Sequence, residues 1–267
     1  MKRRTAGIVI GLLIGVCLVL VLTIAYPFST SEPHAANAEQ FTGVAGTEYH
    51  ISGAITSDGD EYMVFEGIAV EGGERYESLT VRGVQSESYQ AAPGEVVYTR
   101  SEYPDEIETD QILERIDDRE DQHVLRVDRD GENVVFFTRD EDGGDLESSI
   151  TSTAPVIVGS VRNTEYERVQ ESDEEYVYEP QNGWFDGQDG YRITDSTGQV
   201  RVDPDSYTAT AAEVSFTVTP GAGTYAEYLY TTWATDDTFT REVSYEYTSE
   251  NVTVEPPEWV ESLQNAE

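Results

Sequence analysis

Two acidic loops contain the residues best suited to bind a cation. The loops DRDGEN, residues 128–133, and DEDGGD, residues 140–145, place several carboxylates next to glycines, as calcium-binding loops do. Neither loop has the bidentate glutamate that an EF-hand carries at its twelfth position. Because the whole chain is acidic, we interpret these runs as solvated turns and predict no metal site.

No other residue pattern points to catalysis. His34, His50 and His123 are far apart in the sequence and belong to no zinc-binding motif. A serine or cysteine nucleophile needs a neighbouring base, and no GxSxG, SxxK or Cys–His pattern is present. Paired carboxylates of the glycosidase type are not excluded by the sequence. We predict that the chain is not an enzyme, with no catalytic residue and no cofactor.

The charge of the chain restricts its environment and its partners. The 267 residues include 53 acids and 16 bases, a net charge of −37, and Lys2 is the only lysine. Such self-repulsion strains a compact domain, but molar salt shortens the Debye length to about 3 Å and screens it. Surfaces rich in acids and poor in lysine resemble those of haloarchaeal proteins. Because no basic patch follows the first four residues, we predict no nucleic-acid partner.

An apolar segment near the N-terminus predicts a membrane anchor. Residues 6–26 are uncharged and would form a helix about 32 Å long, enough to span a bilayer core of about 30 Å. Lys2, Arg3 and Arg4 precede the segment, so the N-terminus should lie in the cytoplasm and the remaining chain outside. We therefore predict a cytoplasmic cap and transmembrane helix over residues 1–28 of a single-pass cell-membrane protein.

The only cysteine lies within this segment. Lipid attachment needs small residues just before the cysteine, but Val16 precedes Cys17 and the apolar run continues beyond it. We favour a packing residue over a lipidated one. Ala36, Asn37 and Ala38 have the small-x-small pattern of a signal cleavage site. The apolar segment is longer than a signal core of about 7–15 residues, so we favour an uncleaved anchor over a cleaved signal.

Three glycines lie on one face of the predicted membrane helix. Gly7, Gly11 and Gly15 are four residues apart, and GxxxG spacing lets two membrane helices approach closely. A homodimer through this interface is one interpretation. The other is that glycine is simply frequent in membrane helices. The sequence does not choose between the two.

The exterior chain divides into three regions. Residues 29–46 are small and polar without periodicity, which predicts a flexible tether. Residues 47–262 form the predicted β-rich domain, and residues 263–267 a short tail. The alternative to a folded domain over residues 47–262 is an acidic disordered stalk. The 17 tyrosines, 8 phenylalanines and 3 tryptophans of the chain favour a folded core instead.

Short alternating runs separated by turn residues predict antiparallel strands with one buried face. In the first run Tyr49, Ile51, Gly53 and Ile55 alternate with polar or small residues. A hairpin is predicted around Asp130-Gly131. The other predicted strands cover residues 61–70, 76–84, 95–100, 164–170, 174–180, 190–196, 198–204, 207–220, 225–233 and 239–248.

Two segments interrupt the strand pattern. Residues 105–118 carry Ile107, Ile112, Leu113 and Ile116 on one stripe, which predicts a short amphipathic helix. Residues 139–149 are predicted to form a polar loop. Residues 152–163 are ambiguous and compatible with a second short helix over the sheet. The predicted fold class is α+β, mostly β, after an N-terminal transmembrane helix.

Four stretches carry a resemblance to a known family: YTR at 98–100, TEYERV at 164–169, YRITDSTGQVRVDPDS at 191–206 and VEPPEWV at 254–260. Together with the order of strands, they resemble haloarchaeal cell-surface proteins of the LolA/LprG-like lipoprotein type. The resemblance implies a curved antiparallel sheet, a half-barrel, covered by one or two short helices. It also implies that the concave face holds acyl chains. The chain departs from that family because a membrane helix replaces the lipidated cysteine.

These observations predict an extracytoplasmic binding module, anchored in the membrane of a halophilic archaeon, that holds a lipid or another apolar ligand. The alternative is a structural or protein-interaction module of the cell envelope with no small ligand. Asn251 begins an N-x-T sequon and is a candidate glycosylation site. Trp184, Trp233 and Trp259 are candidates to line a pocket, with core or rim packing as the alternative.

Overall fold

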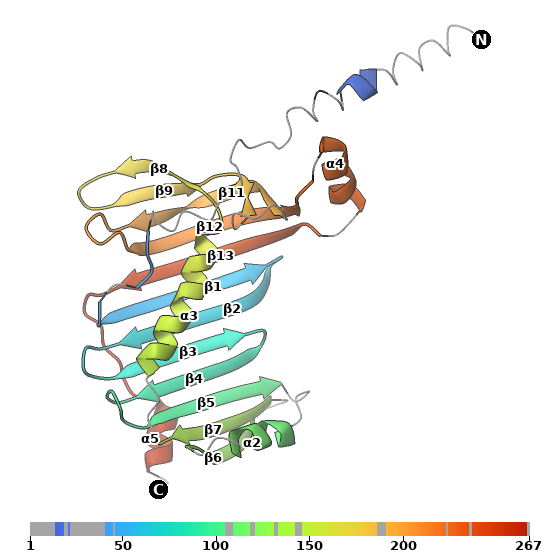
Figure 1. Ribbon diagram of the computed structural model, residues 1–267. Helices are drawn as coiled ribbons and strands as arrows, with labels where there is room; N and C mark the ends of the chain where they lie inside the picture. Colours follow the sequence, from blue (N-terminus) through green and yellow to red (C-terminus); the bar gives the residue numbers. More distant parts are fainter. Residues whose placement is uncertain are drawn as a thin grey trace, which may run out of the picture.

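The computed structural model describes residues 14–18, 21, 41–44, 46–104, 109–117, 121–130, 133–141, 146–185, 191–222, 224–234 and 237–265. Thirteen strands form a single antiparallel sheet, and twelve of them follow the order β6-β7-β5-β4-β3-β2-β1-β13-β12-β11-β9-β8 (Figure 1). The remaining strand, β10 (Gly183–Trp184), pairs with β11. A mostly-β fold with an antiparallel sheet and a few short helices confirms this part of the sequence prediction.

The first half of the chain builds one side of the sheet outward from its middle. Strands β1 (Tyr49–Ser57), β2 (Asp60–Ala69), β3 (Arg75–Val81), β4 (Val84–Gln90) and β5 (Val97–Pro104) each pair with the next. Helix α2 (Thr109–Asp117) follows, and the hairpin of β6 (Gln122–Asp130) and β7 (Asn133–Asp140) then adds to the sheet through β7. The predicted hairpin at Asp130-Gly131 is confirmed by the pairing of Asp130 with Asn133.

The second half returns from the opposite edge. Helix α3 (Leu146–Val161) crosses one face of the sheet, and β8 (Tyr166–Glu171) forms the far edge (Figure 1). Strands β9 (Tyr176–Pro180), β11 (Tyr191–Val202), β12 (Ala209–Pro220) and β13 (Phe239–Thr248) lead back to the middle. The last strand, β13, pairs with the first, β1. Helix α4 (Tyr225–Ala234) connects β12 to β13, and α5 (Glu258–Gln264) ends the described chain.

Helix α3 covers the main hydrophobic core. Its buried residues Ile150, Ala154, Ile157 and Val158 pack on the strands near the middle of the sheet. Gly53 in β1 and Gly67 in β2 lie directly beneath it, because a Cβ atom on Gly67 would sit 2.6 Å from Ile150 Cγ2 and one on Gly53 would sit 3.1 Å from Ile157. The buried sheet residues of this core include Tyr49, Ile51, Ile55, Met63, Phe65, Val214, Phe216, Val243 and Tyr245.

We call the face under α3 and α2 the covered face and the other face of the sheet the open face. Strand β7 is buried on both faces at its end of the sheet. Val134 and Phe136 pack with Ile112 of α2, whereas Val135 and Phe137 pack with Leu263 of α5. This double burial explains the uninterrupted apolar run in β7, which differs from the alternation of the half-exposed strands.

Several predicted elements differ from the structure. Residues 225–233 were predicted to form a strand, but they lie in helix α4, because Ala226, Leu229, Tyr230 and Trp233 have helical spacing that their β-favouring aromatic types obscure. The predicted strands at 190–196 and 198–204 form one strand, β11. Its Gly198 adopts φ +108°, a conformation that glycine tolerates without breaking the strand.

The helices also have different bounds from those predicted. Helix α2 confirms the amphipathic helix expected within 105–118, over Thr109–Asp117. The second helix, ambiguous in the sequence, forms and begins at Leu146, so the predicted polar loop over 139–149 is wrong at its end. Pro155 hid this helix, since proline is unusual inside one. Helix α5 was not predicted.

The folded domain extends beyond both predicted boundaries. Phe41, assigned to the tether, is 1% exposed and packs edge-on against Tyr166. Thr42 N donates to Tyr207 O at 2.7 Å, so this short segment lies beside the start of β12. Leu263, assigned to the tail, lies in α5 and is buried against Val135 and Phe137 of β7. The contacts of these apolar side chains, rather than local composition, set the domain limits.

Most of the predicted membrane helix lies outside the described residues. Residues 14–18 and 21 are helical and exposed. Among the described residues, no helix has the length and apolar character needed to cross a bilayer. Gly7 and Gly11 lie outside the described residues, and Gly15 has no atom within 4 Å of the position a Cβ would take.

Candidate functional site

A pocket with a cavity volume of about 420 Å³ lies on the covered face, between α2 and the first turn of α3. We call it the hydroxyl pocket. Its floor is formed by side chains of β4, β5 and β7: Ser86, Ser88, Thr99, Ser101 and Thr138. Its volume is within the range of about 300–1,000 Å³ that small-molecule sites occupy.

The two sides of the hydroxyl pocket are apolar. Ile112 and Ile116 of α2 form one side, together with Tyr103 and Phe136 from the sheet. Leu146, the first residue of α3, lies on the other side. Hydroxyls below and hydrocarbon beside them make the pocket amphipathic.

Glu77 of β3 is the buried acid of the pocket. It is 7% exposed, and Ser149 Oγ of α3 donates to Glu77 Oε2 at 2.8 Å. Glu77 Oε1 is buried and has no hydrogen-bond partner. Burial raises the pKa of Glu77, while the nearby hydroxyls of Ser149 and Thr153 offset part of that rise. Burial therefore makes the Glu77 carboxyl easier to protonate than a carboxyl in water.

Asp140 at the end of β7 supplies a second unsatisfied oxygen. Asp140 Oδ1 is buried without a hydrogen-bond partner, and the residue lines the same pocket. Buried polar atoms are almost always paired, so two unpaired carboxyl oxygens in one pocket indicate a place where a ligand or water completes the hydrogen bonds.

An ion pair fixes the first turn of α3 beside the pocket. The Arg75 side chain is 5% exposed and donates from Nη2 to Glu147 Oε2 at 2.7 Å and from Nη1 to Gly73 O at 2.9 Å. Glu147 lies in the first turn of α3, where the helix dipole favours an acid. The pair holds the wall of the pocket, including Leu146 and Ser149, against β3.

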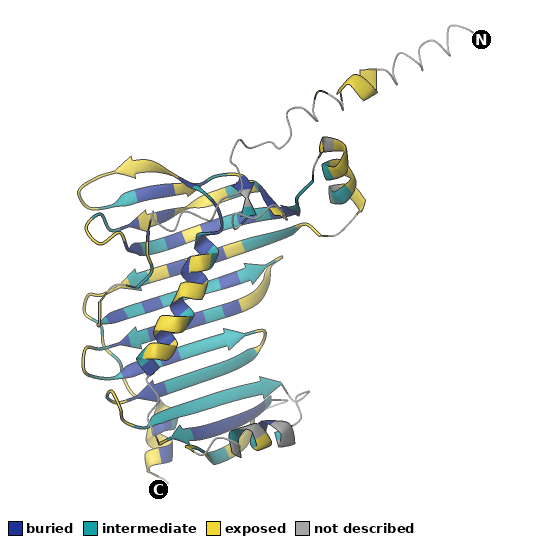
Figure 2. Ribbon diagram, viewed as in Figure 1, coloured by how far each residue is buried: buried dark blue, intermediate teal, exposed yellow. Residues whose placement is uncertain are grey.

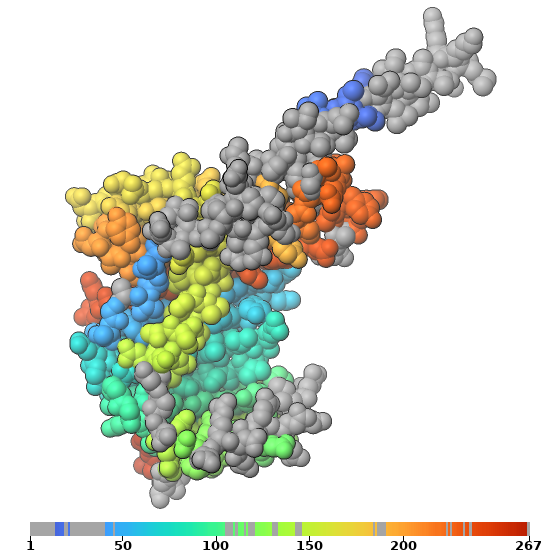
Figure 3. Space-filling model, viewed as in Figure 1, coloured from blue at the N-terminus to red at the C-terminus, as the bar shows by residue number. Residues whose placement is uncertain are grey.

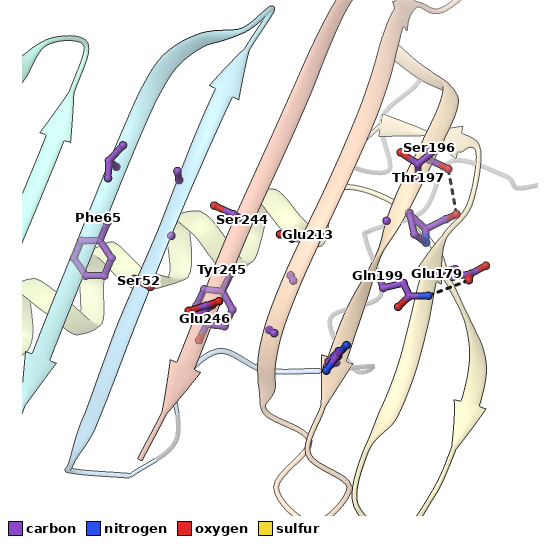
Figure 4. Close-up of a pocket in the computed structure, with 18 of the residues that line it drawn as sticks. Ser52, Phe65, Glu179, Ser196, Thr197, Gln199, Glu213, Ser244, Tyr245 and Glu246 are labelled. Carbon is purple, nitrogen blue, oxygen red and sulfur yellow. Dashed lines mark hydrogen bonds between the residues drawn. The ribbon is translucent and has the colours of Figure 1, made fainter. Parts of the chain in front are cut away.

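A larger hollow of about 1150 Å³ lies on the open face (Figure 4). It is lined by small residues such as Ser52 and Ser244 and by the acids Glu66, Glu179, Glu213 and Glu246, with α3 behind the sheet in this view. Acidic side chains are expected on any surface of this chain. We therefore regard the smaller hydroxyl pocket as the candidate site, since its acid is buried and its walls come from two helices.

The residues singled out from the sequence do not converge. His50 Nε2 lies 2.9 Å from Glu66 Oε1 on the open face, whereas His123 is exposed in β6 and His34 lies outside the described residues. The loops 128–133 and 140–145 are only partly described. In the described part of the chain no group of three or more metal-ligating side chains occurs.

The tryptophans also lie apart. Trp259 of α5 packs on Phe137 and donates to Glu87 Oε2 at 2.9 Å, at the β6–β7 end of the sheet. Trp233 of α4 is 88% exposed, and Trp184 lies in β10. Asn251 is exposed with φ +54° in the chain after β13. Trp259, Trp233 and Asn251 do not line the hydroxyl pocket.

Sequence reasoning missed Glu77, Asp140 and the hydroxyl floor. One signal was present: the strands 84–90 and 97–104 carry Ser or Thr where the central strands carry Ile, Phe or Tyr. That signal has meaning only once the register shows which residues share the covered face, since Ser88 pairs with Thr99 and Ser86 with Ser101.

Comparisons with family models, with curated proteins and with solved structures find no match. The resemblance to LolA/LprG-like proteins therefore stays a prediction.

Proposed function

We propose that the chain is a membrane-anchored, extracytoplasmic binding module of a halophilic organism, which holds one small amphipathic ligand in the hydroxyl pocket. The observation that carries the proposal is the pair of unpartnered, buried carboxyl oxygens, Glu77 Oε1 and Asp140 Oδ1, in one pocket with apolar sides. The predicted half-barrel and acyl-chain binding of LolA/LprG-like proteins point to the same class of ligand.

The chemistry of the pocket defines that ligand. The carboxyl oxygens of Glu77 and Asp140 can accept from ligand hydroxyls, and Glu77 can also donate to a ligand oxygen when it is protonated. The residues that line the pocket include no arginine or lysine in the described part of the chain, so an anionic head would meet no opposite charge. An uncharged head with hydroxyl groups, joined to an apolar body that contacts Ile112 and Ile116, fits both surfaces. A lipid with a hydroxylated head is such a molecule.

The test is to identify what co-purifies with the full chain. The protein is expressed in a halophilic host, extracted from the membrane and purified in molar salt, and organic extracts are analysed by mass spectrometry. The result expected is one class of hydroxylated amphipathic molecule, near one per chain. A folded chain without any such molecule would contradict the proposal and favour the envelope interaction module.

Two matched variants place the ligand. Ser101→Phe fills the hydroxyl pocket from its floor, and Ser52→Phe fills the larger hollow of the open face. We expect Ser101→Phe to lose the ligand and Ser52→Phe to keep it. The reverse pattern would move the site to the open face.

A further inference from the structure

Helix α4 turns its apolar stripe toward solvent. Ala226, Leu229, Tyr230 and Trp233 follow the spacing i, i+3, i+4 and i+7, and all four are exposed, Tyr230 by 68% and Trp233 by 88%. A surface helix normally directs such a stripe at the core. Figure 2 shows the exposed side of α4 at the end of the sheet where it projects beyond β12 and β13 (Figure 1).

Other exposed aromatic residues gather at the same end of the strands. Tyr191, 43% exposed, pairs with Pro220, the last residue of β12 before α4. Tyr62, 37% exposed, follows the β1–β2 turn, where Asp58 N donates to Thr240 O at the start of β13. Among the exposed aromatic residues of the described chain, Tyr207 alone lies toward the opposite end. The stripe therefore carries the two most exposed aromatic side chains at this end of the strands, Tyr230 and Trp233.

The segment around α4 differs in charge from the rest of the chain. Between Glu213 and Asp236 the only charged residue is Glu227, in a chain with 53 acids. A membrane interface favours a segment with few charges and with exposed tyrosine and tryptophan, because these two side chains prefer the headgroup region and acids are costly there. Interfaces with protein partners are also depleted in charge and enriched in tyrosine and tryptophan, so the predicted anchor is what favours a membrane here.

The chain length lets this end of the domain reach a membrane. Twelve residues, 29–40, separate the predicted anchor from Phe41, where the chain joins the folded domain beside Thr208. At about 3.5 Å per residue they span up to about 42 Å. Strand β12, which runs from the Phe41 side to α4, is about 40 Å long at 3.4 Å per residue. Figure 3 shows α4, in orange, at the surface of the molecule.

We propose that α4 is a membrane-docking helix, with Tyr230 and Trp233 in the headgroup region of the bilayer that holds the N-terminal anchor. This inference rests on the membrane anchoring in the proposed function. It adds a second contact with the same membrane, which fixes the orientation of the domain and so the side from which the hydroxyl pocket receives a ligand.

The test uses the full chain in vesicles of a zwitterionic phospholipid with bromine atoms on the upper acyl chain, in molar KCl. Flotation first shows that the chain is inserted. Two single-tryptophan proteins are compared: one keeps Trp233 (W184F and W259F), and the other keeps Trp259 (W184F and W233F). The second is the matched control, because Trp259 of α5 packs on Phe137 at the β6–β7 end of the sheet. We expect about twofold quenching of Trp233 by the bromines and almost none of Trp259.

The outcomes separate the two proposals. Chains that fail to float overturn the anchor itself. Chains that float with Trp233 unquenched overturn the docking helix and leave the anchor standing. A blue-shifted, unquenched Trp233 whose emission depends on protein density assigns the stripe to a second copy and also overturns the docking helix. If loss of Trp259 unfolds the domain, the wild-type chain and W233F give the quenching of Trp233 by difference.

Discussion

The covered face has two regions with the same strand alternation and opposite outcomes. Under the middle of α3, isoleucines of the helix press on Gly53 and Gly67 and on aromatic residues of β1 and β2, and the space is filled. Between α2 and the first turn of α3, the strands present hydroxyls and the space is open. The difference shows that alternation decides which residues face inward, while their type decides whether the interior becomes a core or a site.

The largest effect on stability should come from truncating one isoleucine in each of the two regions. Ile157 is fully buried in α3, under the middle of the helix. Ile157→Ala should lower the unfolding free energy of the protein by about 2–5 kcal/mol. Ile116 is half-buried in the side of the hydroxyl pocket. Ile116→Ala should lower the unfolding free energy by about 1 kcal/mol or less, because this side chain already borders an open space. Urea denaturation in molar KCl measures both. Equal losses would mean that both regions are packed alike.

A smaller effect is expected from adding one methyl group to the filled region. Gly67→Ala places a Cβ 2.6 Å from Ile150 Cγ2 and should cost about 1–3 kcal/mol through overpacking. Gly159→Ala is the control, since no atom lies within 4 Å of its Cβ position and alanine favours a helix by about 1 kcal/mol. Thermal unfolding should shift in opposite directions for the two variants. A neutral Gly67→Ala would argue against close contact under α3.

The pH dependence of stability should identify the buried acid of the open region. Because burial raises the pKa of folded Glu77 above its ordinary value of 4.5, protonation stabilises the fold below that value, and this stabilisation is lost as the pH rises through the folded pKa. Glu77→Gln should therefore gain stability relative to wild type as the pH rises from 4 to 8, which urea denaturation at several pH values measures.

The control for this change is Glu174→Gln on the exposed turn between β8 and β9, which removes one charge without touching the pocket. A constant difference between Glu77→Gln and wild type across the pH range would show that folding leaves the pKa of Glu77 unchanged, and would contradict its burial in the fold.

The smallest effect on stability should come from the hydroxyl floor. Ser88 Oγ and Thr99 Oγ1 lie 3.0 Å apart as a cross-strand pair. Replacing both, as Ser88→Ala with Thr99→Val, should change the unfolding free energy by less than about 0.5 kcal/mol, because both partners of the bond are removed together. The same double variant should lower the amount of co-purified ligand, measured by mass spectrometry. A large loss of stability would make the floor structural.

The sequence by itself determined the strand-rich, antiparallel character of the domain, the hairpin at Asp130-Gly131 and the amphipathic helix at Thr109–Asp117. These follow from local alternation, turn residues and helical spacing, which act over a few neighbouring residues. It did not determine helix α4, because the β-favouring types of Tyr230 and Trp233 masked their helical spacing, nor the start of α3, which Pro155 hid.

Only the tertiary structure decided where the chemistry lies. Glu77 is distant in the sequence from Asp140 and Ser149, and the three line one pocket because β3, β7 and α3 share one face of the sheet. Strand order and burial are set by contacts between distant segments. No local sequence pattern predicts which serine faces a pocket, which carboxyl group is buried away from water, or which apolar stripe is exposed to solvent.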